Sequence, residues 1–508
     1  MPPLLSKTKY LYGIQCPKLL WMAVHEPEKL PEVDEITQHR FDEGHLVGEL
    51  AKKVFPNGID IKTDDFNESL KKSKELLAKR KPLFEAAFKN ENIYSRADIL
   101  FPSSKNEWNV IEVKSSTQPK ELHIHDLAFQ KYCYEQAGLK INKCFLMHIN
   151  GEYVRQGDVN PKELFSQQDV DEQVNEASKD IKDKIKAMLN IISAEKMPGG
   201  KICNECKGPG SCPLPEEYWS FLPENNVFNL YRGGKKGLEL FQSGVYSIKD
   251  IPVSYNLSAN QVIQKRCEET GKPYVDKKHI KSFIDSLKFP LYFLDFETYN
   301  TAIPLYDGLS PYQQIPFQFS LHISDSIDSE PKHHSFLAEG DKDPRLDFLS
   351  ALKKDIGKKG SIIVYNQSFE KRIMNELGRA FPKNEGWINS LTSQFVDLLA
   401  PFQKFYYYDS KQQGSASLKK VLPALTGRAY VDLEIASGES ASLQYLYITH
   451  GATDGTKPAE KEISEIRQNL EKYCSLDTEG MVEILRVLNK RVLNKIEKNE
   501  KDKQMSLK

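Results

Sequence analysis

The run FPLYFLDFET at residues 289–298 constrains the fold of this chain more than any other segment. Apolar side chains continue almost without interruption up to Asp295, and an apolar run of this length predicts a buried β-strand. Strand-like runs return at 317–324 and 360–366, and a helical pattern follows at 369–381. Strands that alternate with helical patterns are typical of an α/β fold, so we predict an α/β domain that begins with this strand.

A second set of strands and helices lies in the N-terminal part of the chain. The strand-like runs are 92–101, 107–116 and 143–150, and helical spacing covers 70–88, 125–138 and 168–195. A chain of 508 residues has room for about two to four domains. We expect an α/β protein with an N-terminal domain over 1–215, a helical connector over 216–285, a C-terminal domain over 286–495 and a charged tail over 496–508.

Charge and hydropathy exclude several classes of protein. Lys and Arg number 70 against 71 Asp and Glu, so the formal net charge is −1 and the chain is not a wholly basic nucleic-acid binder. Any nucleic-acid contact must use a local basic surface. No apolar run approaches the roughly 18 residues of a membrane helix, and Lys7, Lys9 and Lys18 interrupt the first apolar stretch, unlike a signal peptide. We expect a cytoplasmic protein without a membrane partner, and leave its protein partners open.

Three charged residues on adjacent predicted strands form a first candidate site. Asp98 lies at the end of one strand, and Glu112 and Lys114 share one face of the next because they are two residues apart. A carboxylate pair can bind Mg²⁺ or Mn²⁺, which polarises a phosphate and lowers the pKa of a bound water. A lysine can position that water or neutralise developing charge, as phosphodiester hydrolysis requires. An exposed strand face with ordinary charges is the alternative.

Gln130 and Tyr134 follow on the helix predicted at 125–138, four residues apart and therefore on one face. In this order, Asp98, Glu112, Lys114, Gln130 and Tyr134 resemble the core of the PD-(D/E)XK nucleases of the RecB type. The resemblance implies that the first three residues are catalytic. It also implies that Gln130 and Tyr134 lie near the site and the DNA, as substrate-binding residues.

The sequence departs from that family at one metal ligand. The family carries a His in an early helix shortly after a Gly, at a position that falls on Gly48 here. His45 directly follows Gly44 instead. His45, Glu43 or Glu49 can substitute as the ligand, or His45 is an ordinary surface residue.

Three of the eight cysteines, Cys203, Cys206 and Cys212, fall in one short loop rich in Gly and Pro, which predicts a metal site. Cys16 is the candidate fourth ligand and would join the two ends of the N-terminal domain. Zinc is an alternative, although a zinc ribbon normally has two C-x2-C pairs and this loop has one. The set resembles the iron–sulfur nucleases, which include CRISPR-associated RecB-type exonucleases, and this implies a [4Fe–4S] cluster with a structural role. The apolar surroundings of the others predict buried side chains: Cys133, Cys144, Cys267 and Cys474.

Acidic residues in the C-terminal domain form a third constellation. The motif LDFET places Asp295 and Glu297 on one face at a strand's end, and YNQSFE places Asn366 and Glu370 at a strand-to-helix junction. Near the C-terminus, YCSLDT places Tyr473 and Asp477 on one face of a helix. Four acids from separate elements can bind two divalent ions, and Tyr473 can orient the attacking water. Any one of these pairs by itself is more often a set of ordinary polar or charged side chains without a catalytic role.

In this order, Asp295, Glu297, Glu370, Tyr473 and Asp477 resemble the DEDD exonucleases of the RNase H-like fold, in the subgroup with Tyr-x3-Asp. The middle acid of that family is Asp, whereas this chain has Glu370, whose extra methylene can still reach a metal but shifts the geometry. By the resemblance, Asn366 lies near the substrate. Asp397 is a further acid that can act as a helper.

The whole chain resembles prokaryotic proteins that join a RecB-like module to a DEDD-type domain. We therefore expect a metal-dependent DNA nuclease that uses Mg²⁺ or Mn²⁺ and acts on single-stranded DNA or DNA ends. The expected setting is DNA repair or defence against foreign DNA. One alternative is an RNA 3′-exonuclease. Others are a protein that binds nucleic acid without cutting it and a structural protein held together by zinc.

Overall fold

The computed structural model describes residues 4–104, 106–199, 208–430, 433–435, 437–452 and 455–493. Strands and helices alternate along the chain, so the protein has the α/β class that its sequence predicts. The chain separates into two compact units: unit 1 is Met1–Trp219 with Thr301–Gln313, and unit 2 is Ser220–Asn300 with Gln314–Lys508. Within the described residues, no helix is both long and apolar enough to cross a membrane.

This division differs from the sequence-based boundaries in two places. Most of the segment expected as a connector belongs to unit 2, where Tyr274–Val275 (β8) pairs with Tyr407–Tyr408 (β14) and Cys267 packs on Phe405. The segment Thr301–Gln313 follows a strand of unit 2 in sequence, yet it belongs to unit 1, where Ala302 is part of the hydrophobic core.

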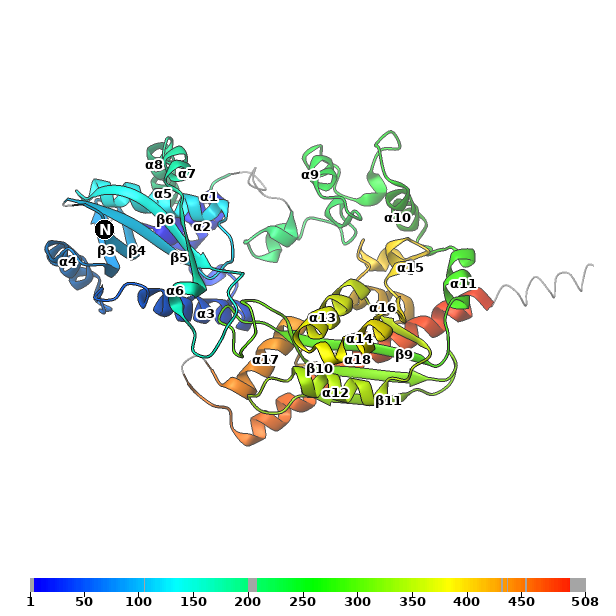
Figure 1. Cartoon of the computed structure of the whole chain (residues 1–508). Coiled ribbons are helices and arrows are strands. Elements are labelled where there is room, and N and C mark those ends of the chain that lie inside the picture. Colours follow the sequence, from blue (N-terminus) through cyan, green and yellow to red (C-terminus); the bar gives the residue numbers. More distant parts are fainter. Residues whose placement is uncertain are drawn as a thin grey trace, which may run out of the picture. The chain divides into compact units, whose positions relative to one another are not determined.

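Unit 1 is built on a seven-stranded sheet (Figure 1). The strands are β2 (Ile59–Asp60), β3 (Leu83–Asn90), β4 (Ile93–Pro102), β5 (Glu107–Lys114), β6 (Lys140–Ile149) and β7 (Phe165–Asp169) in spatial order, with β1 (Leu5–Ser6) beside β4. The pairs β1–β4, β2–β3 and β5–β6 are parallel, and the other pairs are antiparallel. The helix α5 (Glu121–Gln136) makes the crossover that the parallel strands β5 and β6 require.

Helices cover both faces of this sheet. They are α1 (Lys7–Gln15), α2 (Pro17–His25), α3 (Glu35–Lys52), α4 (Phe66–Leu76), α6 (Pro161–Leu164), α7 (Asp171–Ala177) and α8 (Ile181–Ser193), in addition to α5. Because side chains alternate along a strand, Leu100 packs with α1, α5 and α8, while its neighbour Ile99 packs with α3 and the segment Thr301–Gln313.

Two of the helices predicted from residue spacing are not single helices in the structure. The run 70–88 is not one helix: α4 ends before Pro82, which lacks an N–H, and the following LFEAAF forms β3. The pattern of these residues fits either element, and pairing with β4 decides for the strand. The run 168–195 is likewise divided, into the end of β7 and the two helices α7 and α8.

Unit 2 contains a five-stranded sheet in the order β11-β10-β9-β12-β13 (Figure 1). The strands are β9 (Leu291–Tyr299), β10 (Ile315–Ser324), β11 (Lys332–Leu337), β12 (Ser361–Val364) and β13 (Phe395–Asp397). The central strand β9 is antiparallel to β10 and parallel to β12. Its side chains are buried on both faces, as its apolar run predicts: Phe293 enters one core cluster, and Tyr292 and Leu294 enter another.

Helices pack on the sheet of unit 2, and one of them is joined to β10 by buried hydrogen bonds. The helices are α9 (Lys235–Gln242), α10 (Ala259–Thr270), α11 (Lys277–Asp285), α12 (Arg345–Asp355), α13 (Gln367–Ala380), α14 (Glu385–Thr392), α15 (Ala400–Gln403), α16 (Leu418–Thr426), α17 (Gly438–His450) and α18 (Glu460–Leu493). Gln318 on β10 donates a side-chain hydrogen bond to the carbonyl of Leu470, at 2.8 Å. Thr478 bonds Ser320 and His322 at 2.7 and 2.8 Å, so α18 is held against β10 by buried polar contacts.

Candidate functional site

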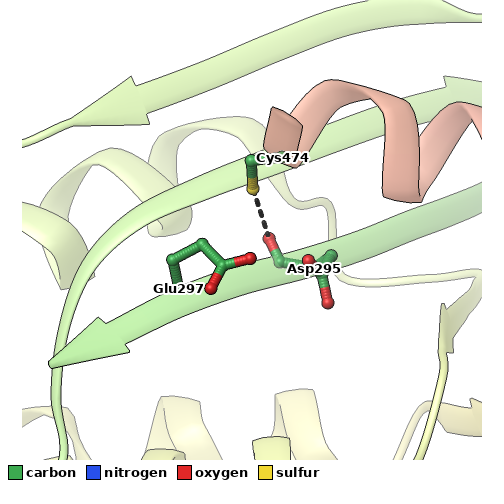
Figure 2. Close-up of side chains that lie close together, drawn as sticks. All are labelled: Asp295, Glu297 and Cys474. Atoms are coloured by element: carbon green, nitrogen blue, oxygen red, sulfur yellow. Dashed lines mark hydrogen bonds between the residues drawn. The ribbon is translucent and has the colours of Figure 1, made fainter. Parts of the chain in front are cut away.

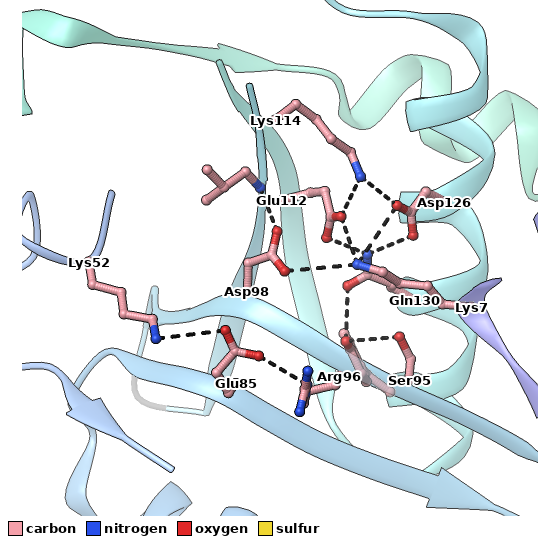
Figure 3. Close-up of polar contacts among 12 residues, drawn as sticks. Lys7, Lys52, Glu85, Ser95, Arg96, Asp98, Glu112, Lys114, Asp126 and Gln130 are labelled. Atoms are coloured by element: carbon pink, nitrogen blue, oxygen red, sulfur yellow. Dashed lines mark hydrogen bonds and ion pairs between the residues drawn. The ribbon is translucent and has the colours of Figure 1, made fainter. Parts of the chain in front are cut away.

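Strands β4 and β5 and helix α5 bring three carboxylates of unit 1 together. We call Asp98, Glu112 and Asp126 the first carboxylate cluster (Figure 3). Lys114 Nζ lies 2.6 Å from Glu112 Oε1 and 2.9 Å from Asp126 Oδ2. Asp98 accepts the backbone N–H of Val113 at 2.8 Å. The structure therefore assembles the three residues that the sequence assigned to catalysis in unit 1.

Gln130 and Tyr134 lie behind this cluster and are fully buried. The Gln130 amide donates to Glu112 Oε2 at 2.6 Å and to Asp126 Oδ1 at 2.9 Å. Tyr134 in turn donates its hydroxyl to Gln130 Oε1 at 3.0 Å. Their contacts position the carboxylates, and neither side chain lines the neighbouring cleft.

Sequence reasoning missed two members of this network, Lys7 and Asp126. Lys7 Nζ lies 2.7 Å from Glu112 Oε1 and 3.8 Å from both Asp98 Oδ1 and Asp126 Oδ2. Asp126 had a detectable signal, because it precedes Gln130 by four residues and shares its helix face. Lys7 had none, since only the fold brings the start of α1 to β5.

The lysines determine the charge state of Glu112. Although burial opposes ionisation, the ammonium groups of Lys114 and Lys7 hold the pKa of Glu112 well below its usual range. Burial and the adjacent charge of Glu112 raise the pKa of Asp98 to about 7. Burial also raises the pKa of Asp126. The first carboxylate cluster thus contains one strongly ionised acid between two that hold protons more tightly.

A cleft of about 720 Å³ opens beside this cluster, and Asp98 and Glu112 line it. Of the three alternative ligands, His45 and Glu49 also line the cleft. Glu43 does not, because its carboxylate accepts the backbone N–H of Ala302 at 2.6 Å. At Gly48, which also lines the cleft, a β-carbon would meet no atom within 4 Å, so this position has room for a side chain.

Glu85 is a further cleft residue that the sequence did not reveal. It lies opposite Asp98, since Phe84 pairs with Ile99 and Ala86 with Ala97. Its φ of 58° is a left-handed value that is rare for a non-glycine residue within a strand. Arg96 Nε lies 2.9 Å from its carboxylate (Figure 3). Strained backbone of this kind is concentrated at functional sites.

Five acids of unit 2 line another cleft, of about 470 Å³: the four that the sequence indicated, and Glu439. We call Asp295, Glu297, Glu370 and Asp477 the second carboxylate cluster. Strand β9 carries the first two, α13 carries Glu370 and α18 carries Asp477. Asn366 and Tyr473 line the same cleft. The structure therefore brings together the residues that the sequence indicated for this site, except the helper acid Asp397.

Local structure explains how Glu370 reaches this cleft. Asn366 takes a left-handed φ of 84° between β12 and α13. The backbone N–H groups of Asn366 and Gln367 donate to the two oxygens of Asp397, at 3.0 and 3.3 Å. Asp397 thus holds the start of α13 by hydrogen bonds, and it does not itself line the cleft.

Burial raises the pKa of every acid in the second carboxylate cluster, and repulsion from other members of the cluster adds to this effect at Asp295 and Glu297. Burial and the charge of Asp477 raise the pKa of Glu297 to about 8. Burial raises the pKa of Glu370 to about 8 and that of Asp477 to about 6. Burial and the charges of the other three acids raise the pKa of Asp295 well above its usual range. Packed acids of this kind favour a bound cation.

The donors of the second cluster fit a divalent ion. Carboxylate oxygens are the ligands that Mg²⁺ and Mn²⁺ prefer. Among the described residues, Glu370 Oε2 is buried without a hydrogen-bond partner. A buried polar atom normally has a partner, and a bound cation would supply one here. Single ligand atoms of Asp295, Glu297 and Cys474 lie within 4.8 Å of one another. The Cys474 thiol donates a weak bond to the Asp295 carbonyl at 3.9 Å (Figure 2).

Two other residues lie beside this cluster: Tyr430, which escaped the sequence analysis, and Lys419, which the sequence offers together with Lys420 as a candidate phosphate contact or as part of an ordinary loop. Tyr430 donates its hydroxyl to Asp477 Oδ1 at 2.5 Å. Lys419 lines the cleft, and its ammonium opposes the rise in pKa that burial causes at Asp477 and Glu297. Lys419 lies in α16 and Tyr430 follows it, both far from α18 in sequence, so only the fold reveals that they lie beside Asp477.

Two of the four predicted cluster-binding cysteines lie in described parts of the chain. Cys16 is fully buried between α1 and α2, and Cys212 packs in the same apolar cluster with Leu214. Cys203 and Cys206 lie outside the described residues. The four cysteines expected to be buried are buried: Cys133, Cys144, Cys267 and Cys474.

Comparison with known proteins gives two matches. Residues 292–417, which include Asp295, Glu297 and Glu370, match a domain of unknown function, DUF2779. The chain is also similar to an uncharacterized protein of Mycoplasma pneumoniae, the MG366 homolog, with 26% identity over 236 residues. That match covers 41% of this chain and 34% of the relative, so the chain spans about a third of the relative's length.

Proposed function

We propose that this protein is a metal-dependent nuclease with two phosphodiester-cleaving sites, one in each unit. The observation that carries the proposal is the convergence of acids from separate elements on two clefts. Unit 1 would be a PD-(D/E)XK nuclease of the RecB type, and unit 2 an RNase H-like exonuclease of the DEDD type. DNA that is single-stranded or has free ends is the proposed substrate, and the cytoplasm the proposed location.

In unit 1, Asp98 and Glu112 would hold Mg²⁺ or Mn²⁺ at the cleft, with His45 or Glu49 as a further ligand. A bound ion would supply a polarised phosphate and a water of lowered pKa. Lys114 is held 2.6 Å from Glu112, where its ammonium can neutralise charge that develops on the phosphate. Gln130 fixes the carboxylate of Glu112 through its amide.

In unit 2, Asp295, Glu297, Glu370 and Asp477 would hold two such ions. Tyr473 lies one helical turn before Asp477 and lines the cleft, where its hydroxyl can orient the attacking water. Asn366 is exposed directly before the start of α13 and lines the cleft, where it can contact the substrate strand. By its resemblance to the DEDD exonucleases, this site would trim nucleic-acid strands from the 3′ end.

Cleavage of labelled DNA in Mn²⁺ by wild type, Glu112→Ala, Asp295→Ala and the double variant tests this function. We expect each single variant to lose the activity of one unit and the double variant to lose all cleavage. Equal cleavage by wild type and the double variant would reject the proposal. DNA and RNA strands of matched sequence, in competition at controlled salt, would distinguish a deoxyribonuclease from a ribonuclease.

We also propose that Cys16, Cys203, Cys206 and Cys212 hold a [4Fe–4S] cluster that stabilises unit 1. The support is the loop's sequence together with the shared apolar cluster of Cys16 and Cys212. Iron, sulfide and zinc are to be counted after anaerobic purification. About four irons per chain is the expected result. One zinc without iron would reject the cluster in favour of a zinc site.

A further inference from the structure

The ammonium of Lys7 lies within the first carboxylate cluster, and the proposed reaction gives it no role. Its Nζ atom is 2.7 Å from Glu112 Oε1 and 3.8 Å from Asp98 Oδ1 (Figure 3). Lys7 begins α1, directly after β1, and β1 pairs with β4 through Leu5 and Ser6. The sheet therefore fixes the position of Lys7, although it lies close to the start of the chain.

Lys7 uses bonding capacity that a metal ion needs. Glu112 accepts hydrogen bonds from Lys7, Lys114 and Gln130. An ionised carboxylate has about four lone-pair sites, so these donors leave little of it for another ligand. Asp98 and Glu112 both line the cleft. A divalent ion shared by these two acids would consequently lie beside the Lys7 ammonium and be repelled by it.

Formal charges show what restores balance. Metal binding requires ionised carboxylates, and with all three acids of the first cluster ionised, the ammoniums of Lys7 and Lys114 leave one net negative charge. A divalent ion would change this to one net positive charge. A phosphodiester brings one negative charge and makes the assembly neutral. Without Lys7, the divalent ion alone would neutralise the carboxylates.

We propose that Lys7 couples the binding of metal and phosphate in unit 1: it keeps the divalent ion weakly bound until a phosphodiester enters the cleft. This inference rests on the proposed function, because it takes these two species as the ligands of the site. Lys7 is in this sense a positioning residue, which acts through the charge of the first cluster. The site would hold its metal firmly only with a nucleic-acid strand present.

Manganese affinity tests this directly, because a competitor and a structural residue shift it in opposite directions. Full-length chains carry Asp295→Asn and Asp477→Asn, which disable the second cluster, and bound Mn²⁺ is measured by electron paramagnetic resonance. We expect Lys7→Met to bind Mn²⁺ at least tenfold more tightly than this parent. Lys7→Arg keeps the charge and should match the parent. Lys9→Met is the control on the same helix, since Lys9 Nζ donates to the carbonyl of Leu4 at 3.2 Å instead of to a carboxylate of the first cluster.

A second measurement adds a cleavage-resistant phosphorothioate oligodeoxynucleotide. It should tighten Mn²⁺ binding by the parent at least tenfold and change Lys7→Met by less than threefold. An oligonucleotide of equal length with neutral methylphosphonate linkages should have no effect on either protein. The difference between the two oligonucleotides isolates the phosphate charge.

The outcomes separate this inference from the proposed function. If the parent binds Mn²⁺ and folded Lys7→Met binds it equally or more weakly, the coupling role is overturned while the metal site stands. If none of the proteins binds Mn²⁺ at the first cluster, both the coupling and the nuclease assignment of unit 1 are overturned. Circular dichroism checks folding, and Lys7→Gln carries the same expectations if Lys7→Met does not fold.

Discussion

In unit 1 the buried carboxylates lie between two lysines, whereas in unit 2 four acids face one another across a cleft. Lys7 and Lys114 lie within hydrogen-bond distance of Glu112 in the first carboxylate cluster. The second has Lys419 as the one basic residue among the described residues that line its cleft. The comparison teaches that similar ligands can be organised in two ways. The first cluster is held together by the protein's own cations, while the second packs its acids together with a single lysine at the cleft.

The largest expected difference concerns loss of a carboxylate in unit 1. Glu112→Gln leaves Lys7 and Lys114 without their main counter-charge, and we expect it to reduce the free energy of unfolding of unit 1 by about 3–5 kcal/mol. Chemical denaturation of metal-free protein measures this. Glu121→Gln, at an exposed position on α5, is the control and should change stability little. A loss below about 1 kcal/mol would show that the lysines do not organise the first cluster.

The matching change in unit 2 should have the opposite sign. Asp295→Asn removes one of four acids that repel each other, so we expect metal-free unit 2 to gain about 2 kcal/mol in free energy of unfolding. Asp397→Asn should instead destabilise unit 2, because Asp397 accepts backbone N–H groups at the start of α13. Destabilisation of unit 2 by Asp295→Asn would contradict the comparison.

The stability of metal-free unit 2 should fall as pH rises from 6.5 to 8. Because the folded-state pKa values of Glu297 and Glu370 are raised to about 8, the folded protein binds more protons than the unfolded chain in this range. Their stabilising contribution is therefore complete at low pH and is lost as pH rises through 8. We expect a loss of about 1–2 kcal/mol for each of these two acids, measured by denaturation at several pH values. Saturating Mn²⁺ should abolish the trend, and a flat profile without metal would argue against buried, repelling acids.

The smallest effect is expected at Tyr430. Tyr430→Phe removes the hydroxyl that donates to Asp477 at 2.5 Å, and we expect unit 2 to lose about 1 kcal/mol in stability. Tyr447→Phe is the matched control, because Tyr447 donates to Glu462 in an exposed contact at 3.2 Å. Equal effects of the two substitutions in thermal unfolding would mean that the hydrogen bond from Tyr430 to Asp477 stabilises unit 2 no more than an exposed one.

Sequence patterns predicted the site residues that are close together along the chain. Glu112 and Lys114 share a strand face, and Tyr473 and Asp477 share a helix face, because strand and helix periods fix those relations locally. The central position of β9 also agrees with its apolar run. The same reasoning failed for 70–88, where helical spacing concealed β3 and therefore Glu85.

The sequence by itself determined the α/β class, the buried strand that carries Asp295 and Glu297, and the local pairs of candidate ligands. Only the tertiary structure decided which charges meet: Lys7 with Glu112, and Tyr430 with Asp477. It also decided that Thr301–Gln313 packs in unit 1. The physical reason is that spacing along a strand or helix follows from backbone geometry over a few residues. Contacts between distant segments follow from how whole elements bury their apolar faces, and the sequence pattern of neither partner reveals them.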